Sequence, residues 1–399
     1  MNILVINRNA FGQDDVVSIF RNLGHNVRIY DHKNITDHRH EEIEKELLDI
    51  VNKDKISLIF SYNYVPVVSI AIKDTDVKYI SYVYDSPNIA LYTYSIIYPC
   101  NYVFIFDYAV YEELRRGGIK TVYYLPLSVH TDRLEKTLSK KPLKKDASTG
   151  QPVFKHDVSF IGSLYNEKHN FYERIMDALS DKHDYVKGYL DALVAAQSKV
   201  YDSFFIPQML KKDVMDILQE VFPYPGRADS LATPEYVYAH YFLARKVAEI
   251  ERTTLLGAVS EKFNLSLFTH SATPNIPKAH NLGKVDYYDE MPFVFRDSKI
   301  NLNLSLKSIL TGIPLRCIDI MGCGGFLLTN YQADLFRHFE PGVHFDYFTD
   351  EKDLLNKVDY YLTHDDERIT IAENARICIK ENHNLTNYLQ EMIEFVFEG

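Results

Sequence analysis

A stretch in the last quarter of the chain, "IPLRCIDIMGCGGFLLTN" (313–330), places two charged residues and three glycines in an otherwise apolar run. Helical spacing puts Arg316 and Asp319 on one face near the start of a predicted helix, where unpaired backbone N–H groups attract anions. An arginine there can hold a diphosphate through two hydrogen bonds, and a carboxylate one turn later can accept from two ribose hydroxyls. The competing interpretation is a surface Arg–Asp pair on an ordinary helix that ends at glycines.

A Gly-Ser turn in "VSFIGSLYNEKHNFYERI" has a second anion-binding pattern. Gly162 and Ser163 follow a predicted strand and precede a predicted helix. Glycine allows a close approach of the backbone to a ligand, and serine can cap the helix or donate to a phosphate. A plain helix cap is the competing explanation.

A carboxylate follows another strand in "SYVYDSPNIALYT". Asp85 stands at the strand end, and Pro87 fixes the turn after it. A carboxylate at this edge can act as a general base that faces a cleft. A turn aspartate that only hydrogen-bonds its own backbone is the alternative. Asp107, in "FIFDYA", is a weaker candidate of the same kind.

Other catalytic motifs are missing from the sequence. The first strand is followed by "NRNAFG" and not by GxGxxG, which argues against a dinucleotide oxidoreductase. The chain has no GxxxxGK[ST] phosphate loop and no GxSxG nucleophile elbow. No His or Asp pair has metal-ligand spacing, so the sequence predicts no metal site and no required cofactor.

The elements that must position these residues alternate between strands and helices. Short apolar runs such as "NILVIN" and "ISLIFSYN" alternate with amphipathic segments such as "HEEIEKELLDIVNKD" in the first third of the chain. Repeated units of this length predict a parallel sheet covered on both faces. We expect an N-terminal α/β domain over residues 1–150. The segment around the expected boundary, "TDRLEKTLSKKPLKKDASTGQPVFKHD" (131–157), is polar and lysine-rich and is typical of a linker or an excursion between domains.

A second α/β domain is expected over residues 151–380, with a mainly helical insertion at about 167–260. A C-terminal helix, 381–399, is expected to return to the N-terminal domain. Two such domains in series place a cleft between the carboxyl ends of two sheets, which is where ligands bind in folds of this kind.

Composition excludes several classes of function. The formal charge of −11 and the lack of a dense basic block argue against nucleic-acid binding. No apolar window is long enough to span a membrane, and the start of the chain does not resemble a signal peptide. The four cysteines form neither a disulfide framework nor a zinc pattern, so we expect a cytoplasmic protein.

Several blocks together resemble the CgeB-like, spore-maturation type of glycosyltransferases, which pair a DUF3880-type N-terminal region with a group 1 glycosyltransferase domain. The blocks are "YVYDSP", "NYVFIFD", "YYLPLSV", "VSFIGSLYNE", "INLNLSL" and "GIPLRCIDIMGCGGFLLTNY". The resemblance covers about residues 55–390 and is most specific at 300–330. It implies a GT-B fold, in which two Rossmann-like domains face a cleft, the acceptor is held by the first and the nucleotide-sugar donor by the second.

The resemblance also implies roles for single residues. Asp319 matches the acidic residue that holds the ribose, and Arg316 lies near the diphosphate. Gly162 and Ser163 match the glycine loop that faces the phosphates. Gly324 belongs to the glycines that let the backbone approach the donor.

The segment "GKVDYYDE" stands where such enzymes grip the base, with Val285 and Tyr288 as candidates. Many retaining relatives carry a glutamate eight residues before the ribose-binding acid. Here that position is Thr311, so neither retention nor inversion is assigned.

The main hypothesis is therefore a glycosyltransferase of the hexosyltransferase type that needs no metal. UDP is the expected donor nucleotide because it is common in this superfamily, and the acceptor is expected to be a protein or a glycan. Asp85 is the candidate base and Arg316 assists the leaving diphosphate. The alternatives are a GT-B-like nucleotide-sugar epimerase and a non-enzymatic two-domain ligand-binding protein. The sugar and the oligomeric state are not assigned.

Overall fold

The first sheet of the computed structural model, which describes residues 1–167 and 170–398, has six parallel strands in the order β2-β1-β3-β4-β5-β6. The strands are β1 (Asn2–Ile6), β2 (Asn26–Tyr30), β3 (Leu58–Tyr62), β4 (Lys78–Val83), β5 (Asn101–Ile105) and β6 (Val122–Tyr124). The helices around this sheet are α1 (Gln13–Asn22), α2 (Glu41–Asp54), α3 (Pro66–Ile72) and α4 (Tyr108–Arg116), with the 3₁₀ turns η1 (Ile89–Tyr92) and η2 (Tyr94–Ile97). The strand order changes direction between β1 and β3, so the crevice of this sheet opens beyond the carboxyl ends of these two strands.

The second sheet is also six-stranded and parallel, in the order β12-β11-β10-β7-β8-β9. Its strands are β7 (His156–Ile161), β8 (Leu265–Phe268), β9 (His280–Asn281), β10 (Ser298–Asn303), β11 (Leu327–Asn330) and β12 (Asp346–Phe348). Helices α11 (Ala244–Lys262), α12 (Met291–Arg296), α13 (Leu315–Gly322), α14 (Leu335–His338), α15 (Glu351–Thr363) and α16 (Asp365–Asn382) accompany it. This is the Rossmann strand order, whose switch point lies between β7 and β10.

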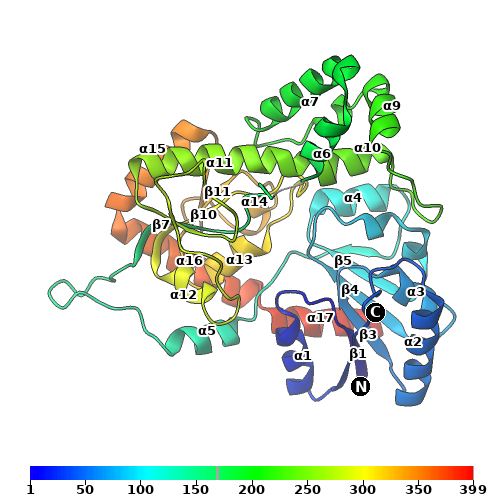
Figure 1. The fold of residues 1–399 in the computed structure, drawn as a ribbon. Helices are drawn as coiled ribbons and strands as arrows, with labels where there is room; N and C mark the ends of the chain where they lie inside the picture. Colours follow the sequence, from blue (N-terminus) through cyan, green and yellow to red (C-terminus); the bar gives the residue numbers. More distant parts are fainter. Residues whose placement is uncertain (168–169, 399) are drawn as a thin grey trace.

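The helical insertion follows β7 and builds a core of its own. Its helices are α6 (Phe171–Ala178), η3 (Asp181–His183), α7 (Asp184–Gln197), α8 (Ile206–Met209), α9 (Lys212–Val221), α10 (Pro234–Val237) and the π-helical turn η4 (Tyr238–Leu243). η4 continues into α11, whose first turns pack in the insertion and whose later turns pack on the second sheet. Figure 1 shows α11 crossing above the second sheet toward the insertion.

The segment expected to be a linker is not simply a linker, because it contains helix α5 (Thr131–Ser139). Leu134 is buried and reaches toward Gly322 of α13, where an added Cβ would lie 3.2 Å from Leu134 Cδ1. The surrounding lysines hide this short apolar face in the sequence. Helix α5 matters for function because it also carries Arg133, described below.

The last helix, α17 (Leu385–Glu398), packs against α1 of the first sheet (Figure 1). Its buried Leu389, Met392 and Val396 share a core with Val16 and Phe20 of α1. In the described residues, no helix has both the length and the apolar character required to cross a lipid bilayer.

Candidate active site

The crevice of the first sheet is built by residues that follow β1, β3 and β4. Asn63, which follows β3 at φ +57°, is buried and organises this edge. Its Nδ2 donates to Asp85 Oδ2 at 2.7 Å, and its Oδ1 accepts from the backbone N–H of Asp85 at 3.1 Å. One amide side chain therefore fixes both the backbone and the carboxylate of Asp85, which the sequence indicated as a candidate base.

Asp85 faces a cavity of about 450 Å³ that lies between the two sheets. The first domain contributes Arg8, Asn63 and Asp85 to its lining, and the second contributes Tyr165 and Arg245. Asp85 keeps an exposed surface, while the surrounding walls remove part of its water and raise the pKa of the carboxyl group. A carboxylate that is accessible and has a raised pKa is suited to accept a proton from a ligand in this cavity.

The crevice of the second sheet brings Gly162 and Arg316 together, as their positions after β7 and at the start of α13 require. Gly162 has φ +150°, and a Cβ at this position would lie 2.7 Å from Nη2 of Arg316. Arg316 is the second residue of α13, and its Nη1 donates to Oδ1 of Asn303 at 3.3 Å. The partly buried guanidinium therefore lies against Gly162, where a side chain would have to displace it.

A second arginine, Arg252 of α11, joins this group. It is 3% exposed, and its guanidinium donates to the carbonyl oxygen of Leu304 at 2.6 Å and to that of Ser163. Its Nε has no hydrogen-bond partner within the described part of the chain. The ring of Tyr165 lies 4.7 Å from the Arg252 guanidinium and also lines the Asp85 cavity, so it connects the two crevices.

The two arginines form a positively charged site that the described protein atoms do not neutralise. Neither guanidinium has a carboxylate within ion-pair distance in residues 1–167 and 170–398. Loss of water, followed by repulsion from Arg252, lowers the pKa of Arg316 to about 10. Two cations held together without a counter-charge are the arrangement expected of an anion site before its ligand binds.

The Ser163 hydroxyl is hydrogen-bonded within its own loop. It donates to Glu167 Oε1 at 2.8 Å and accepts from the backbone N–H of Tyr165 at 2.9 Å. The following helix begins only at Phe171, where Asn170 is the cap. Ser163 takes part in the site through its carbonyl oxygen, which accepts from Arg252.

Asp319 lies on the same helix as Arg316 but reaches a different group. It is 3% exposed, and its Oδ1 accepts from the hydroxyl of Tyr287 at 3.1 Å. Loss of water raises the pKa of its carboxyl group to about 7, against the attraction of Arg133. Arg133, from α5, is paired with Asp15 of α1 and lies over the rings of Tyr287 and Tyr288.

The remaining predicted site residues are Val285, Tyr288 and Gly324. Val285 and Tyr288 are both partly buried in the loop before α12, and the Tyr288 ring lies 5.0 Å from the Arg133 guanidinium. The backbone N–H of Tyr288 donates to Oδ1 of Asp286 at 2.8 Å, so this donor already has a partner.

Gly324 is not brought to the site. It has φ +73° and follows the C-terminal end of α13, opposite the end that carries Arg316, so its freedom serves the turn into β11.

Thr311 and Asp107 have structural partners. The buried carboxylate of Asp107 accepts from the backbone N–H groups of Leu310 and Thr311 and from the Thr311 hydroxyl. Asp107 thus ties the loop after β10 to the first domain and is not open to a substrate as a base would be. Thr311 is held in the same network. It occupies the position at which many retaining relatives of the resembled family carry a glutamate, and it has no carboxylate with which to take that role.

Sequence reasoning missed Arg133, Arg252 and Tyr165. Arg133 stood in the expected linker, and Arg252 stood in the expected insertion, far from any strand end. No local pattern marks either residue. Tyr165 has φ +58°, a strained conformation that no sequence pattern reveals for a tyrosine.

Comparison with known proteins agrees with this architecture. Residues 241–394, which include Arg252, Tyr287, Arg316 and Asp319, match a family model described as glycosyl transferase-like. No curated protein matches the chain.

Solved structures of similar fold include three with coverage of nearly the whole chain. An apo structure of OtsA has a TM-score of 0.55 at 8% identity, with 99% of both chains covered. Anabaena Alr3699/HepE in complex with UDP-glucose has a TM-score of 0.54 at 10% identity, with 100% of both chains covered. Sucrose-phosphate synthase from Thermosynechococcus elongatus has a TM-score of 0.51 at 12% identity, with 100% of this chain and 99% of that chain covered.

Two Rossmann-type sheets that face each other across a cleft define a GT-B fold, which confirms the predicted fold class. The glycosyl transferase-like match, at residues 241–394, covers β8 to β12 of the second sheet and ends in α17.

Proposed function

We propose that the protein is a glycosyltransferase that moves a sugar from a nucleotide-diphosphate sugar, with UDP as the nucleotide, to an acceptor held against the first domain. One observation carries this proposal: Arg252 and Arg316 stand together without a counter-charge at the switch point of the second sheet. The glycosyltransferase-like match of residues 241–394 supports the reaction class. The complexes of the Anabaena protein with UDP-glucose support the choice of donor.

The two arginines and the N-terminus of α13 would bind the diphosphate. When the sugar leaves, negative charge grows on the diphosphate oxygen, and donors fixed in advance stabilise it without further reorganisation. Gly162 leaves room for the phosphates beside Arg316 because it has no side chain. Since two cationic side chains supply this charge, the proposed reaction does not require a metal ion.

The nucleoside would bind beside Asp319. The carboxylate already accepts a hydrogen bond from the Tyr287 hydroxyl, so a ribose hydroxyl can replace that donor without leaving the buried carboxylate unpaired. Val285 and Tyr288 flank this position and are proposed to contact the base.

Asp85 is the proposed general base. The acceptor hydroxyl oxygen would form the new bond to the anomeric carbon while its proton passes to the Asp85 carboxylate. The bond between the anomeric carbon and the diphosphate breaks, and its electron pair leaves with the diphosphate. The acceptor, a protein or glycan, would bind to the domain at 1–150 and the donor to the domain at 151–380, with the helix at 381–399 returning to the first domain. The four cysteines are unpaired, which suits the proposed cytoplasmic location.

Calorimetric titration with UDP, GDP, ADP and CMP, with and without EDTA, tests the proposal. We expect selective binding of UDP that EDTA does not change, and release of UDP from UDP-glucose only when an acceptor is turned over. Absence of binding to every nucleotide would refute the donor site. Conversion of the bound sugar without an acceptor would instead indicate an epimerase.

A further inference from the structure

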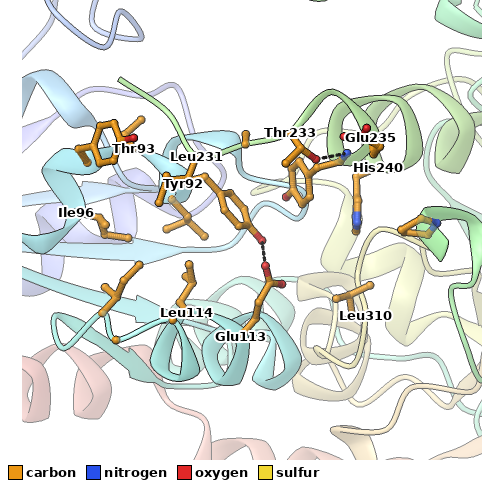
Figure 2. Close-up of a pocket in the computed structure, with 18 of the residues that line it drawn as sticks. Tyr92, Thr93, Ile96, Glu113, Leu114, Leu231, Thr233, Glu235, His240 and Leu310 are labelled. Atoms are coloured by element: carbon orange, nitrogen blue, oxygen red, sulfur yellow. Dashed lines mark hydrogen bonds between the residues drawn. The ribbon is translucent and has the colours of Figure 1, made fainter. Parts of the chain in front are cut away.

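A second cavity, of about 730 Å³, lies between the first domain and the helical insertion (Figure 2). Its size falls in the range of sites that hold small organic ligands, about 300–1,000 Å³. One wall comes from η1, η2 and α4 and includes the buried Leu91, Ile96 and Leu114. The facing wall comes from the insertion and includes Phe204 and Leu231.

The charge of the lining selects among ligands. The residues that line the cavity include no lysine and no arginine, whereas they include Glu113 and Glu235. Tyr92 donates its hydroxyl to Glu113 Oε1 at 3.2 Å, and loss of water raises the pKa of Glu113 (Figure 2). Burial lowers the pKa of His240 to about 4, so this ring is neutral near pH 7. The cavity lining therefore supplies no cationic side chain to pair with a phosphate or a carboxylate, and its many apolar residues suit an uncharged ligand.

The mouth of the cavity is apolar as well. Tyr94, Ile97 and Leu231 are 52%, 60% and 57% exposed, although each is a large apolar residue. Exposed apolar groups of this size next to an apolar cavity mark a surface that a ligand covers.

The cavity shares its walls with the Asp85 cavity. Ile89 and Ala90 line the Asp85 cavity, and the next residue, Leu91, lines the apolar one. On the facing side, Tyr241 lines the first and His240 the second. The backbone N–H of Ile89 donates to the Tyr241 hydroxyl at 2.7 Å at the boundary between the two cavities. A ligand in the apolar cavity is therefore adjacent to the cavity that Asp85 lines.

We infer that this cavity binds an uncharged alkyl or acyl chain that forms the body of the acceptor, with its reacting hydroxyl directed to Asp85. The inference rests on the proposed function but assigns a lipid-like acceptor in place of the protein or glycan expected from the sequence. The site is built by the helical insertion, so the insertion would select the acceptor.

Calorimetry with n-hexyl, n-heptyl and n-octyl β-D-glucoside, each below its micelle concentration, tests the inference. Burial of one methylene contributes about 0.8 kcal/mol, so the affinity should rise about 3- to 4-fold with each added carbon. Octanoate, which has an aliphatic chain and a negative charge, should bind at least about 10-fold more weakly than octyl glucoside. An affinity independent of chain length, or equal binding of octanoate, overturns the inference.

Two variants and one control locate the binding. Ile97→Asp, at the exposed mouth, and Ala232→Phe, which fills part of the cavity, should each weaken octyl glucoside binding about 10-fold. Ile377→Asp introduces the same charge at an exposed position of α16 and should change nothing. If neither cavity variant weakens binding, the chain binds elsewhere and the inference fails.

UDP titration of the same proteins separates the two proposals. If UDP binds while the glucosides do not, the inference fails and the proposed function stands. If the glucosides bind with the expected chain-length dependence while no nucleotide binds, the proposed function fails and the cavity remains an apolar-ligand site.

Discussion

Replacement of Arg316 by methionine should separate a ligand-binding role from a structural one. Arg316→Met keeps an unbranched apolar stem, removes the guanidinium that lies 5.7 Å from the Phe160 ring centre, and removes the charge beside Arg252. The pKa of Arg316 is lowered from 12.5 to about 10, which means that keeping the guanidinium charged costs the folded protein about 3 kcal/mol. Because the side chain keeps some contact with solvent, we take about 1–2 kcal/mol of this amount.

The variant also loses the hydrogen bond to Asn303, which is worth about 1 kcal/mol. The net change in unfolding free energy is therefore between about 0 and +1 kcal/mol. With an unfolding entropy of about 2.1 cal/mol/K per residue, the melting temperature of this chain should stay constant or rise by about 1 °C. Loss of a charged hydrogen bond to the diphosphate should weaken UDP binding by about 1.5–3 kcal/mol, or about 10- to 150-fold.

Differential scanning calorimetry and isothermal titration with UDP measure the two quantities on the same protein. Arg116→Met is the matched control, because Arg116 is an exposed arginine paired with Glu112 on α4, and it should leave the UDP affinity unchanged. If Arg316 had a structural role as one partner of a buried pair, its removal would lower the free energy of unfolding by about 3–5 kcal/mol. For this chain that corresponds to a melting temperature about 4–6 °C lower. A melting temperature lowered by that amount together with an unchanged UDP affinity would refute the reasoning.

Four further changes have defined outcomes. Asp85→Asn should lower the rate of sugar transfer about 10²- to 10⁴-fold and leave UDP affinity intact, so full activity in an acceptor assay would exclude Asp85 as the base. Burial raises the pKa of Asp319 to about 7, so its carboxylate becomes mostly ionised as the pH rises above that value. Calorimetric titrations should therefore show that the affinity for UDP-glucose increases as the pH rises from 6 to 8. Asp319→Asn should abolish that increase. Lys307→Met leaves Glu251 buried without the cation that lies 2.9 Å from it, and it should lower the free energy of unfolding by about 3–5 kcal/mol. The loss is measured as a lower melting temperature. The double variant Lys307→Met/Glu251→Gln should recover most of the lost stability. Gly162→Ala would place a Cβ 2.7 Å from Arg316 Nη2 and should weaken UDP binding, whereas Gly226→Ala, with open space around it, should not.

Much of the architecture could be predicted because parallel sheets leave a clear trace in the sequence. Buried strands such as β3 are uniformly apolar or small, and they alternate with amphipathic helices. The position of Gly162 after β7 and that of Arg316 at the start of α13 followed from the same alternation, because functional residues in such folds lie at strand ends and helix starts.

The rest of the site depends on contacts that no local pattern encodes. Arg133 comes from a helix whose short apolar face is surrounded by lysines, and Arg252 comes from the middle of a long helix. Only the tertiary structure brings them to Asp319 and Arg316. Ser163 and Gly324 were predicted as site residues from their positions in sequence motifs. The Ser163 hydroxyl is hydrogen-bonded within its own loop, and Gly324 lies in the turn that follows helix α13.

The return of α17 to α1 has a consequence for the order in which the protein folds during synthesis. The core of the first sheet contains Ile3 and Val5 near the N-terminus and also Leu389 and Val396 near the other end of the chain. A nascent chain emerges from the ribosome from its N-terminus, so the face of the first sheet that α1 and α17 cover stays open until residue 396 has been made. During that interval the exposed apolar surface is open to chaperones or to other chains. The first domain is therefore completed only after the second sheet has been made.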